Sequence, residues 1–291
     1  SSSAFRKDPH TIMANYTVAD IKALRERTGA GMLDVKKALQ EADGDVDKAQ
    51  EIIRVKGLKG ITKREGRSTS DGLVALDVSP GPDGEVGVLV EVNSETDFVA
   101  KSGAFVALAD KVLAAAVASG AADVDELLAA DSGGAPLKNA VDDAAATLGE
   151  RIVVRRVARV VGEKVTSYLH RTSPDLPPQV GVLVASDAAG AAVARDVAMH
   201  VAAYSPTYLS REDVPEQIVA DERRIAEETA RNEGKPAAAL PKIVEGRLGG
   251  YFKENVLLEQ PYAREPKKTV SAILKEAGGT VTGFARFRVG A

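Results

Sequence analysis

Side chains that carry out covalent or metal chemistry are scarce in this sequence. It contains three histidines and no cysteine, so disulfides, thiol catalysis and zinc sites built on thiolates are excluded. His170 and His200 could meet in a folded chain, but a catalytic pair also needs a nucleophile and an orienting carboxylate, and a metal needs a third ligand. The spacing of residues along the chain identifies no such nucleophile, carboxylate or third ligand. We therefore expect no catalytic residue, metal or cofactor, while an enzyme that uses these two histidines stays an alternative.

Motifs for binding nucleotides are also missing. No Gly-x-x-x-x-Gly-Lys-Ser/Thr run exists, which argues against a P-loop. Gly29-Ala30-Gly31 has Asp34 where a dinucleotide fingerprint requires glycine, and it follows a predicted helix rather than a strand. The chain is therefore not expected to bind a nucleotide by either route.

The most informative segment is Asn93 to Lys101, between an apolar strand and a helix. Ser94, three residues before Asp97, predicts a helix N-terminus and places Phe98 in the first turn. The ring could be presented to a partner. It also lies two helical turns before Phe105, and this periodicity alone favours a shared core stripe.

Bulk composition narrows the class of protein. The 291 residues are 44% hydrophobic, enough for two or three compact units, and the net charge of −4 argues against a nucleic acid as the main ligand. No run approaches the roughly 18 apolar residues of a membrane span. The lack of cysteine suits a reducing cytoplasm. Residues 1–12 are predicted to be an added leader before a native start at Met13.

Four arginines are spaced along one predicted strand: Arg151, Arg155, Arg156 and Arg159. A solvated sheet face is the favoured interpretation over a phosphate site. The alternative that these arginines bind an acidic surface of a partner stays open.

The N-terminal part, 13–56, is predicted to be three short helices, because apolar residues recur at helical spacing and glycines interrupt the runs. Such a small core suggests a docking module. A basic run follows at 56–67, for which a solvated linker or helix tail is favoured over a nucleic-acid patch, because no aromatic residues are interleaved to stack on bases. We interpret 57–70 as a linker.

The remainder contains an internal repeat. Val86-Gly87-Val88-Leu89-Val90 recurs letter for letter as Val180-Gly181-Val182-Leu183-Val184. Each copy predicts a hairpin, helices and a third strand. In the first copy the strand 73–78 precedes a turn at 79–84, and one helix covers 97–119. We therefore expect an α+β fold with two three-stranded antiparallel sheets, in core subdomains 71–162 and 163–291.

The second copy carries an insertion at 211–257, predicted to be a projecting helical hairpin. Its heptad signal is too short to define an oligomer, so a homodimer stays open. At the turn that corresponds to Phe98, the second copy reads Ala185-Ser186-Asp187-Ala188, without an aromatic residue. A ring that the shared fold does not need is better explained by a partner.

Several motifs resemble those of one family. Leu24 to Met32 with Lys36-Lys37-Ala38-Leu39, then Thr96-Asp97-Phe98-Val99-Ala100-Lys101, Met199 to Ala203, and Val281-Thr282-Gly283-Phe284 are similar, in order, to the signatures of the elongation factor Ts family. The resemblance runs from about Tyr16 to Gly290. It implies a non-enzymatic guanine-nucleotide exchange factor in cytoplasmic protein synthesis, with an N-terminal domain like the ubiquitin-associated fold.

The resemblance also implies a partner and contact residues. The partner would be elongation factor Tu, GDP-bound or nucleotide-free, with no direct contact to nucleic acid or membrane. Thr96, Asp97, Phe98 and Val99 would dock on its nucleotide domain, where the Phe98 ring would disturb the Mg²⁺ site. Further contacts would come from Arg25, Met32, Leu33, Leu148, Gly149 and His170. A translation-associated scaffold that does not drive release is the alternative.

Overall fold

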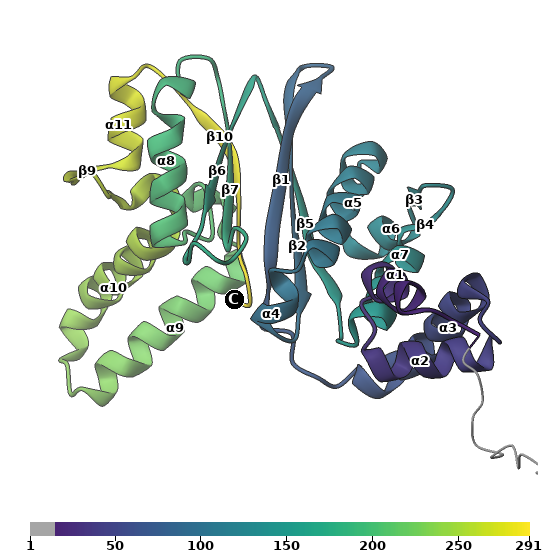
Figure 1. Ribbon diagram of the computed structural model, residues 1–291. Coiled ribbons are helices and arrows are strands. Elements are labelled where there is room, and N and C mark those ends of the chain that lie inside the picture. The colour runs from purple at the N-terminus through teal and green to yellow at the C-terminus, as the bar shows by residue number, and fades with distance from the viewer. Residues whose placement is uncertain (1–14) are drawn as a thin grey trace, which may run out of the picture.

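The computed structural model describes residues 15–291 and has an α+β fold (Figure 1). Two three-stranded antiparallel sheets pack face to face in the centre, and helices cover the outer face of each. The predicted fold class is confirmed. No helix among residues 15–291 combines the length and apolarity needed to cross a membrane. The predicted leader, 1–12, lies outside the described residues.

Three helices form the N-terminal part: α1 (Val18–Thr28), α2 (Met32–Glu41) and α3 (Val46–Arg64). Thr17 and Asp20 form a capping box that starts α1, and Gly29 ends it in the left-handed conformation, which glycine adopts without steric cost. Leu24, Val35 and Leu39 fill a small common core. The three predicted helices are confirmed.

The helix α3 extends further than expected, to Arg64, so the basic run is a helix tail and the linker begins after it. Arg64 is buried because its guanidinium donates hydrogen bonds to the carbonyls of Ala145, at 2.9 Å, and Gly57, at 3.2 Å. Gly57 allows α3 to approach the neighbouring core, since a Cβ there would lie 2.6 Å from the Ala146 carbonyl oxygen. The tail is therefore helical and packs on the core at Gly57 and Arg64, while Lys56, Leu58 and Lys63 are exposed.

The first sheet has the order β1-β2-β5 and is covered by helices. Its elements are β1 (Asp71–Gly81), β2 (Gly84–Ser94), α4 (Asp97–Ala100), α5 (Gly103–Ser119), α6 (Val124–Ala129), β3 (Asp131–Ser132), β4 (Ala135–Pro136), α7 (Leu137–Leu148) and β5 (Val153–Gly162).

Two expectations for this sheet are wrong. The predicted turn at 79–84 is mostly strand, because Gly81 pairs with Gly84 and only two residues connect β1 to β2. The single helix predicted over 97–119 is two helices, since Ser102 accepts the Phe105 N–H and caps a new start.

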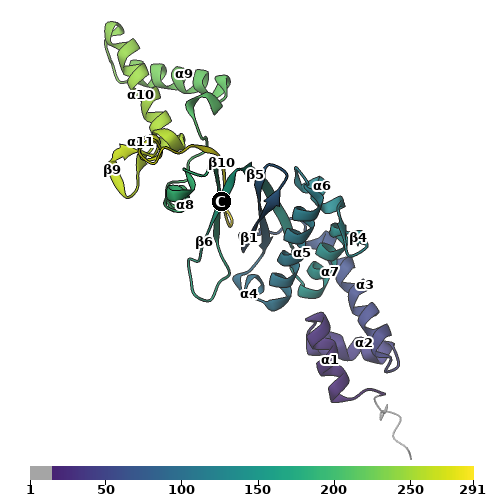
Figure 2. The same ribbon diagram turned by 90° about the horizontal axis from the view of Figure 1, so that it is seen from above.

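The second sheet has the order β10-β7-β6. Its elements are β6 (Lys164–His170), β7 (Val180–Ser186), α8 (Ala191–Tyr204), β8 (Pro261–Tyr262), β9 (Glu265–Thr269), α11 (Val270–Glu276) and β10 (Val281–Arg288). The insertion consists of η1 (Arg211–Asp213), α9 (Glu216–Asn232), η2 (Ala237–Ala239), α10 (Leu240–Asn255) and η3 (Leu257–Glu259). Figure 2 shows that the hairpin of α9 and α10 projects away from the sheets, as predicted.

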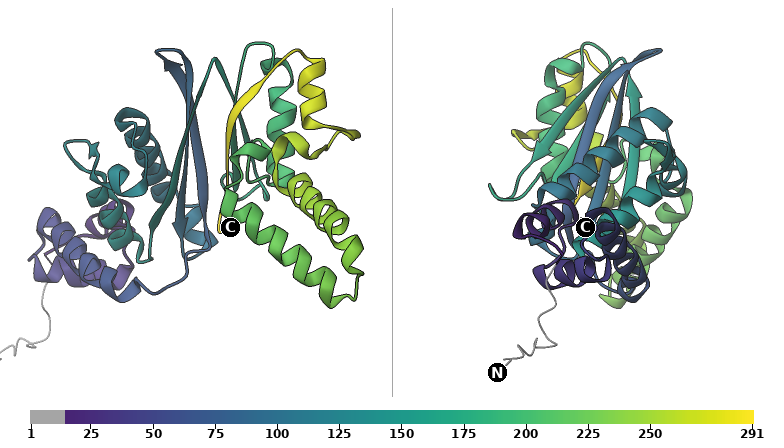
Figure 3. Two further views of the ribbon diagram at one scale, coloured as in Figure 1. Left: turned by 180° about the vertical axis from the view of Figure 1, so that it is seen from behind. Right: turned by 45° about the vertical axis from the view of Figure 1, so that its right-hand side comes forward.

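The two sheets face each other (Figure 3), and the glycine and leucine of each pentapeptide lie on the facing sides of β2 and β7. A Cβ on Gly87 would lie 3.0 Å from Leu183 Cδ1, and a Cβ on Gly181 would lie 2.7 Å from Leu89 Cδ1. Each glycine therefore receives the leucine of the other copy. The valines of both copies point to the opposite faces, where they pack on the covering helices. Every position of the repeat thus has a packing role.

A buried carboxylate joins the same two sheets. Glu91 on β2 has no exposed surface and accepts hydrogen bonds from Arg156 Nε at 2.7 Å and from the Gly290 N–H at 3.1 Å. Arg156 also donates to the Arg288 carbonyl, and Arg155 forms an ion pair with Glu91. The expected solvated arginine face is therefore wrong at Arg156, which is partly buried and paired with Glu91, while Arg155 is exposed and also pairs with that carboxylate.

We predict that Gly87→Ala and Gly181→Ala each destabilise the protein by about 1–3 kcal/mol, because the added methyl group overpacks the sheet contact. Gly249→Ala is the control. It lies inside α10 with open space around its Cβ position, and it should stabilise the protein by up to about 1 kcal/mol. Urea unfolding of the three variants measures the difference, and equal midpoints would contradict the sheet-contact account.

Candidate functional site

The segment between β2 and α4 forms a tight turn that ends in one helical turn. Thr96 is the N-cap, because its hydroxyl accepts the Val99 N–H at 3.2 Å. Ser94 is the last residue of β2, and its hydroxyl donates to the Thr96 carbonyl at 2.9 Å. The predicted helix start is confirmed, but the assignment of Ser94 as the capping residue is wrong by two positions.

Phe98 is the most exposed aromatic side chain among the described residues, with 75% of its surface accessible. Its neighbours Val99 and Ala100 are buried in the core of the first sheet. Phe105 is fully buried, but it belongs to α5, and the break at Lys101 and Ser102 removes the shared helical stripe. The core interpretation of Phe98 is therefore wrong: a fixed backbone holds its ring in solvent.

Two glutamates tie this turn to the end of α7. Glu150 accepts the Thr96 N–H at 3.0 Å and the Thr96 hydroxyl at 2.6 Å. Glu95 accepts the Arg151 N–H at 2.8 Å. The sequence interpretation missed both residues, because the partners lie more than fifty positions apart. The bonds bring the Leu148-Gly149 turn next to the Phe98 turn.

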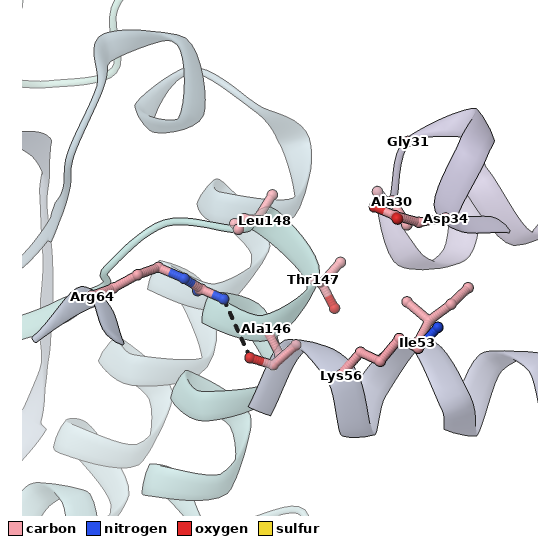
Figure 4. Close-up of a pocket in the computed structure, with 12 residues that line it drawn as sticks. Ala30, Gly31, Asp34, Ile53, Lys56, Arg64, Ala146, Thr147 and Leu148 are labelled. Carbon is pink, nitrogen blue, oxygen red and sulfur yellow. Dashed lines mark hydrogen bonds between the residues drawn. The ribbon is translucent and has the colours of Figure 1, made fainter. Parts of the chain in front are cut away.

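The same end of α7 faces the N-terminal helices across a pocket of about 320 Å³ (Figure 4). Gly31, in the turn between α1 and α2, and Asp34, in the first turn of α2, lie on one side, and Thr147 and Leu148 lie on the other. Met32 and Leu33, at the start of α2, are 49% and 65% exposed. Arg25 is also exposed, beside Met32 on a shallow groove of α1.

His170 ends β6 and is exposed, and its Nδ1 lies 3.2 Å from the Tyr168 hydroxyl. The loop after it is tied to β1, because the Gln179 side chain donates to the Gly72 carbonyl at 2.9 Å. Residue Asp71, next to Gly72, is paired with Ser94. His170 therefore lies at the same end of the sheets as the Phe98 turn, next to which the bonds of Glu150 hold Leu148-Gly149.

Asp71, which is paired with Ser94, has acidic neighbours at this turn. The pKa of Asp71 is raised by partial burial and by the negative charges of Asp97 and Glu150. Asp97 and Glu150 therefore lie within electrostatic reach of Asp71.

His200 has a different environment from His170. It is 99% buried, its Nε2 donates to Gln260 Oε1 at 2.8 Å, and its Nδ1 accepts the Ala263 N–H at 3.1 Å. Both ring nitrogens are thus used by structural bonds, and the two histidines have separate partners. Within residues 15–291 no cluster of three His, Cys, Asp or Glu side chains could hold a metal ion.

The geometry describes a class of protein that acts through surface contacts: an exposed ring and apolar side chains on rigid elements, with the candidate catalytic histidines apart.

Comparison with known proteins specifies the class. The family model described as "Elongation factor TS" matches residues 95–291. Elongation factor Ts of Beutenbergia cavernae is 71% identical over 281 residues, which cover 96% of this chain and all of that protein. Elongation factor Ts of Renibacterium salmoninarum and of Micrococcus luteus are each 66% identical, with the same coverage.

The chain belongs to the elongation factor Ts family, the non-catalytic nucleotide exchange factors of translation elongation, which act on elongation factor Tu in the cytoplasm. The enzyme alternative based on His170 and His200 is therefore wrong. The exposed ring and the separate histidines agree with a function exerted by binding.

We predict that His200 makes stability depend on pH. Burial lowers its pKa below the usual 6.5, against the opposing effect of the Gln260 bond, so the unfolded chain binds more protons as the pH falls through about 6.5. Stability should therefore fall between pH 7.5 and pH 5.5, and His200→Gln should show a smaller fall. Urea unfolding at both pH values measures it. His170→Gln, at an exposed position, is the control and should keep the wild-type slope. Identical slopes for wild type and His200→Gln would contradict the prediction.

Proposed function

We propose that this chain binds elongation factor Tu in its GDP-bound and nucleotide-free states, and that the Phe98 ring promotes GDP release. The ring would insert into the nucleotide domain of the partner and disturb its Mg²⁺ site. The observation that carries this proposal is one large apolar ring, three-quarters exposed, on a backbone anchored by buried Val99 and Ala100. A preorganised group loses little conformational entropy on binding, so most of its burial energy remains available.

The magnitude of the contact limits what Phe98 can do. Burying one such side chain is worth about 1.5–3 kcal/mol, and about 1.4 kcal/mol corresponds to tenfold in an equilibrium constant. Phe98 alone would weaken nucleotide binding by about ten- to a hundredfold. Because linkage is reciprocal, nucleotide would weaken binding of the factor by the same ratio.

Larger acceleration needs further contacts that hold the partner in its distorted state. Met32 and Leu33 offer exposed apolar surface, and Arg25 beside them offers a charge. Leu148-Gly149 and His170 lie at the same end of the sheets as Phe98. We propose that these positions form one extended contact, in which the N-terminal helices and both sheets take part.

Thr96, Asp97 and Val99 complete the docking segment. Thr96 and Val99 act by holding the turn, through the cap and through burial. Asp97 has a different role. It places a carboxylate beside the ring, and carboxylate oxygens are ligands that Mg²⁺ accepts. Its charge would therefore draw the ion away from the nucleotide phosphates while the ring displaces protein side chains.

Release of labelled GDP from purified elongation factor Tu tests the proposal. Phe98→Ala should slow the stimulated release about ten- to a hundredfold, and Phe98→Leu should lose less, because it keeps apolar surface. Val161→Ala is the matched control: Val161 is exposed on β5, but it pairs with Val86 at the opposite end of the sheet from Ser94. It should leave the release rate unchanged.

The scaffold alternative gives a different result. A scaffold would bind the partner without stimulating release, and Phe98→Ala would then alter neither property. If the wild-type chain stimulates release while Phe98→Ala leaves both rate and affinity intact, the ring is not the wedge. A homodimer through the α9–α10 hairpin stays a prediction, which sedimentation of the free chain would test.

A further inference from the structure

We propose that Glu95 and Glu150 are positioning residues for nucleotide exchange, forming a reciprocal clamp that sets the direction of the Phe98 ring. Each carboxylate binds the backbone of the segment that carries the other. This inference rests on the proposed role of Phe98, and it adds two residues to the exchange machinery that do not themselves have to touch the partner.

The clamp consists of four charge-assisted hydrogen bonds. Glu150 Oε1 accepts the N–H groups of Glu95 at 3.1 Å and Thr96 at 3.0 Å, and Oε2 accepts the Thr96 hydroxyl at 2.6 Å. In the other direction, Glu95 Oε2 accepts the Arg151 N–H at 2.8 Å. Bonds of this kind are shorter and about twice as strong as those between neutral groups.

The clamp continues directly into the helical turn of Phe98. The Thr96 hydroxyl that donates to Glu150 also accepts the Val99 N–H, so one oxygen joins the clamp to the N-cap of α4. This helix has only four residues. A single helical turn is unstable by itself, so its geometry depends on the bonds that cap it together with the burial of Val99 and Ala100. The exposed ring has no packing of its own that could replace them.

Glu95 also reaches the segment that leads from α3. Arg67 forms an ion pair with Glu95, with 3.5 Å between Nη1 and Oε1, and Arg151 donates to the Arg67 carbonyl at 2.7 Å. Next to this pair, the Asn93 side chain donates to the Thr69 carbonyl at 2.8 Å. The connection to the N-terminal helices is thus attached to the Phe98 turn, so docking of those helices and direction of the ring are mechanically linked.

A double-mutant cycle with Phe98 separates positioning from a general structural role. Glu150→Ala should slow stimulated GDP release about tenfold when Phe98 is present, because the loss of charge-assisted bonds releases the turn. In the Phe98→Ala background the same substitution should cause almost no further loss, since no ring remains to be positioned. Glu150→Gln keeps the shape and part of the bonding, and it should recover part of the rate.

Two controls accompany the cycle. Asp142→Ala removes a carboxylate on α7, whose partner in the structure is Lys138, and should leave release unchanged. Circular dichroism and thermal unfolding report whether each variant is folded. If Glu150→Ala does not fold, Thr96→Val and Thr96→Ser replace it in the cycle, because valine lacks the hydroxyl that reaches Glu150 and serine keeps it.

Each outcome decides one of the two hypotheses. The clamp is supported if Glu150→Ala slows GDP release on its own and the double variant releases GDP no more slowly than Phe98→Ala. If the fold-losses of the two single variants multiply in the double variant, the clamp hypothesis is overturned, while the wedge hypothesis stays intact. A Phe98→Ala variant that releases GDP at the wild-type rate would overturn the wedge, and the clamp with it.

Discussion

The contact between the two sheets is the constraint on which the rest of this structure depends. Gly87 receives Leu183, and Gly181 receives Leu89, so the inner faces approach more closely than side chains at the glycine positions would allow. The contact is reciprocal because the same five residues occur in both strands. It fixes β2 against β7, and the turn that follows β2 therefore lies at the same end as the loop that precedes β7. Phe98 and His170 share one end of the molecule for this reason.

The site built at that end carries out no covalent step, and its residues show why none is needed. Exchange requires only that the partner bind better in a distorted state than in its nucleotide-bound state. Surface contacts on rigid supports provide that difference in affinity. Phe98 would contribute one part, and the N-terminal helices and the second sheet would contribute others. The buried Glu91 network, which joins β2 to β5 and to the segment after β10, keeps these supports in one arrangement.

Local patterns predicted much of the fold. Apolar spacing and glycine positions identified the three N-terminal helices, the hairpin insertion and both three-stranded sheets. They failed where tertiary contacts changed a boundary. The α3 tail is helical to Arg64 because carbonyls of α7 and α3 bind its guanidinium. The predicted long helix divides because the Ser102 hydroxyl caps a new helix start, and as a result Phe98 is exposed while Phe105 is buried.

The sequence alone determined the repeat, the absence of thiol chemistry and the motifs that resemble the elongation factor Ts family. These features depend on residue type and on local order along the chain. Only the tertiary structure decided that Phe98 is exposed, that Arg155 and Arg156 pair with a buried carboxylate, and that Glu95 and Glu150 bind each other's segments. Each of these depends on residues more than fifty positions apart or on the burial of a whole element, and short-range periodicity contains no information about either.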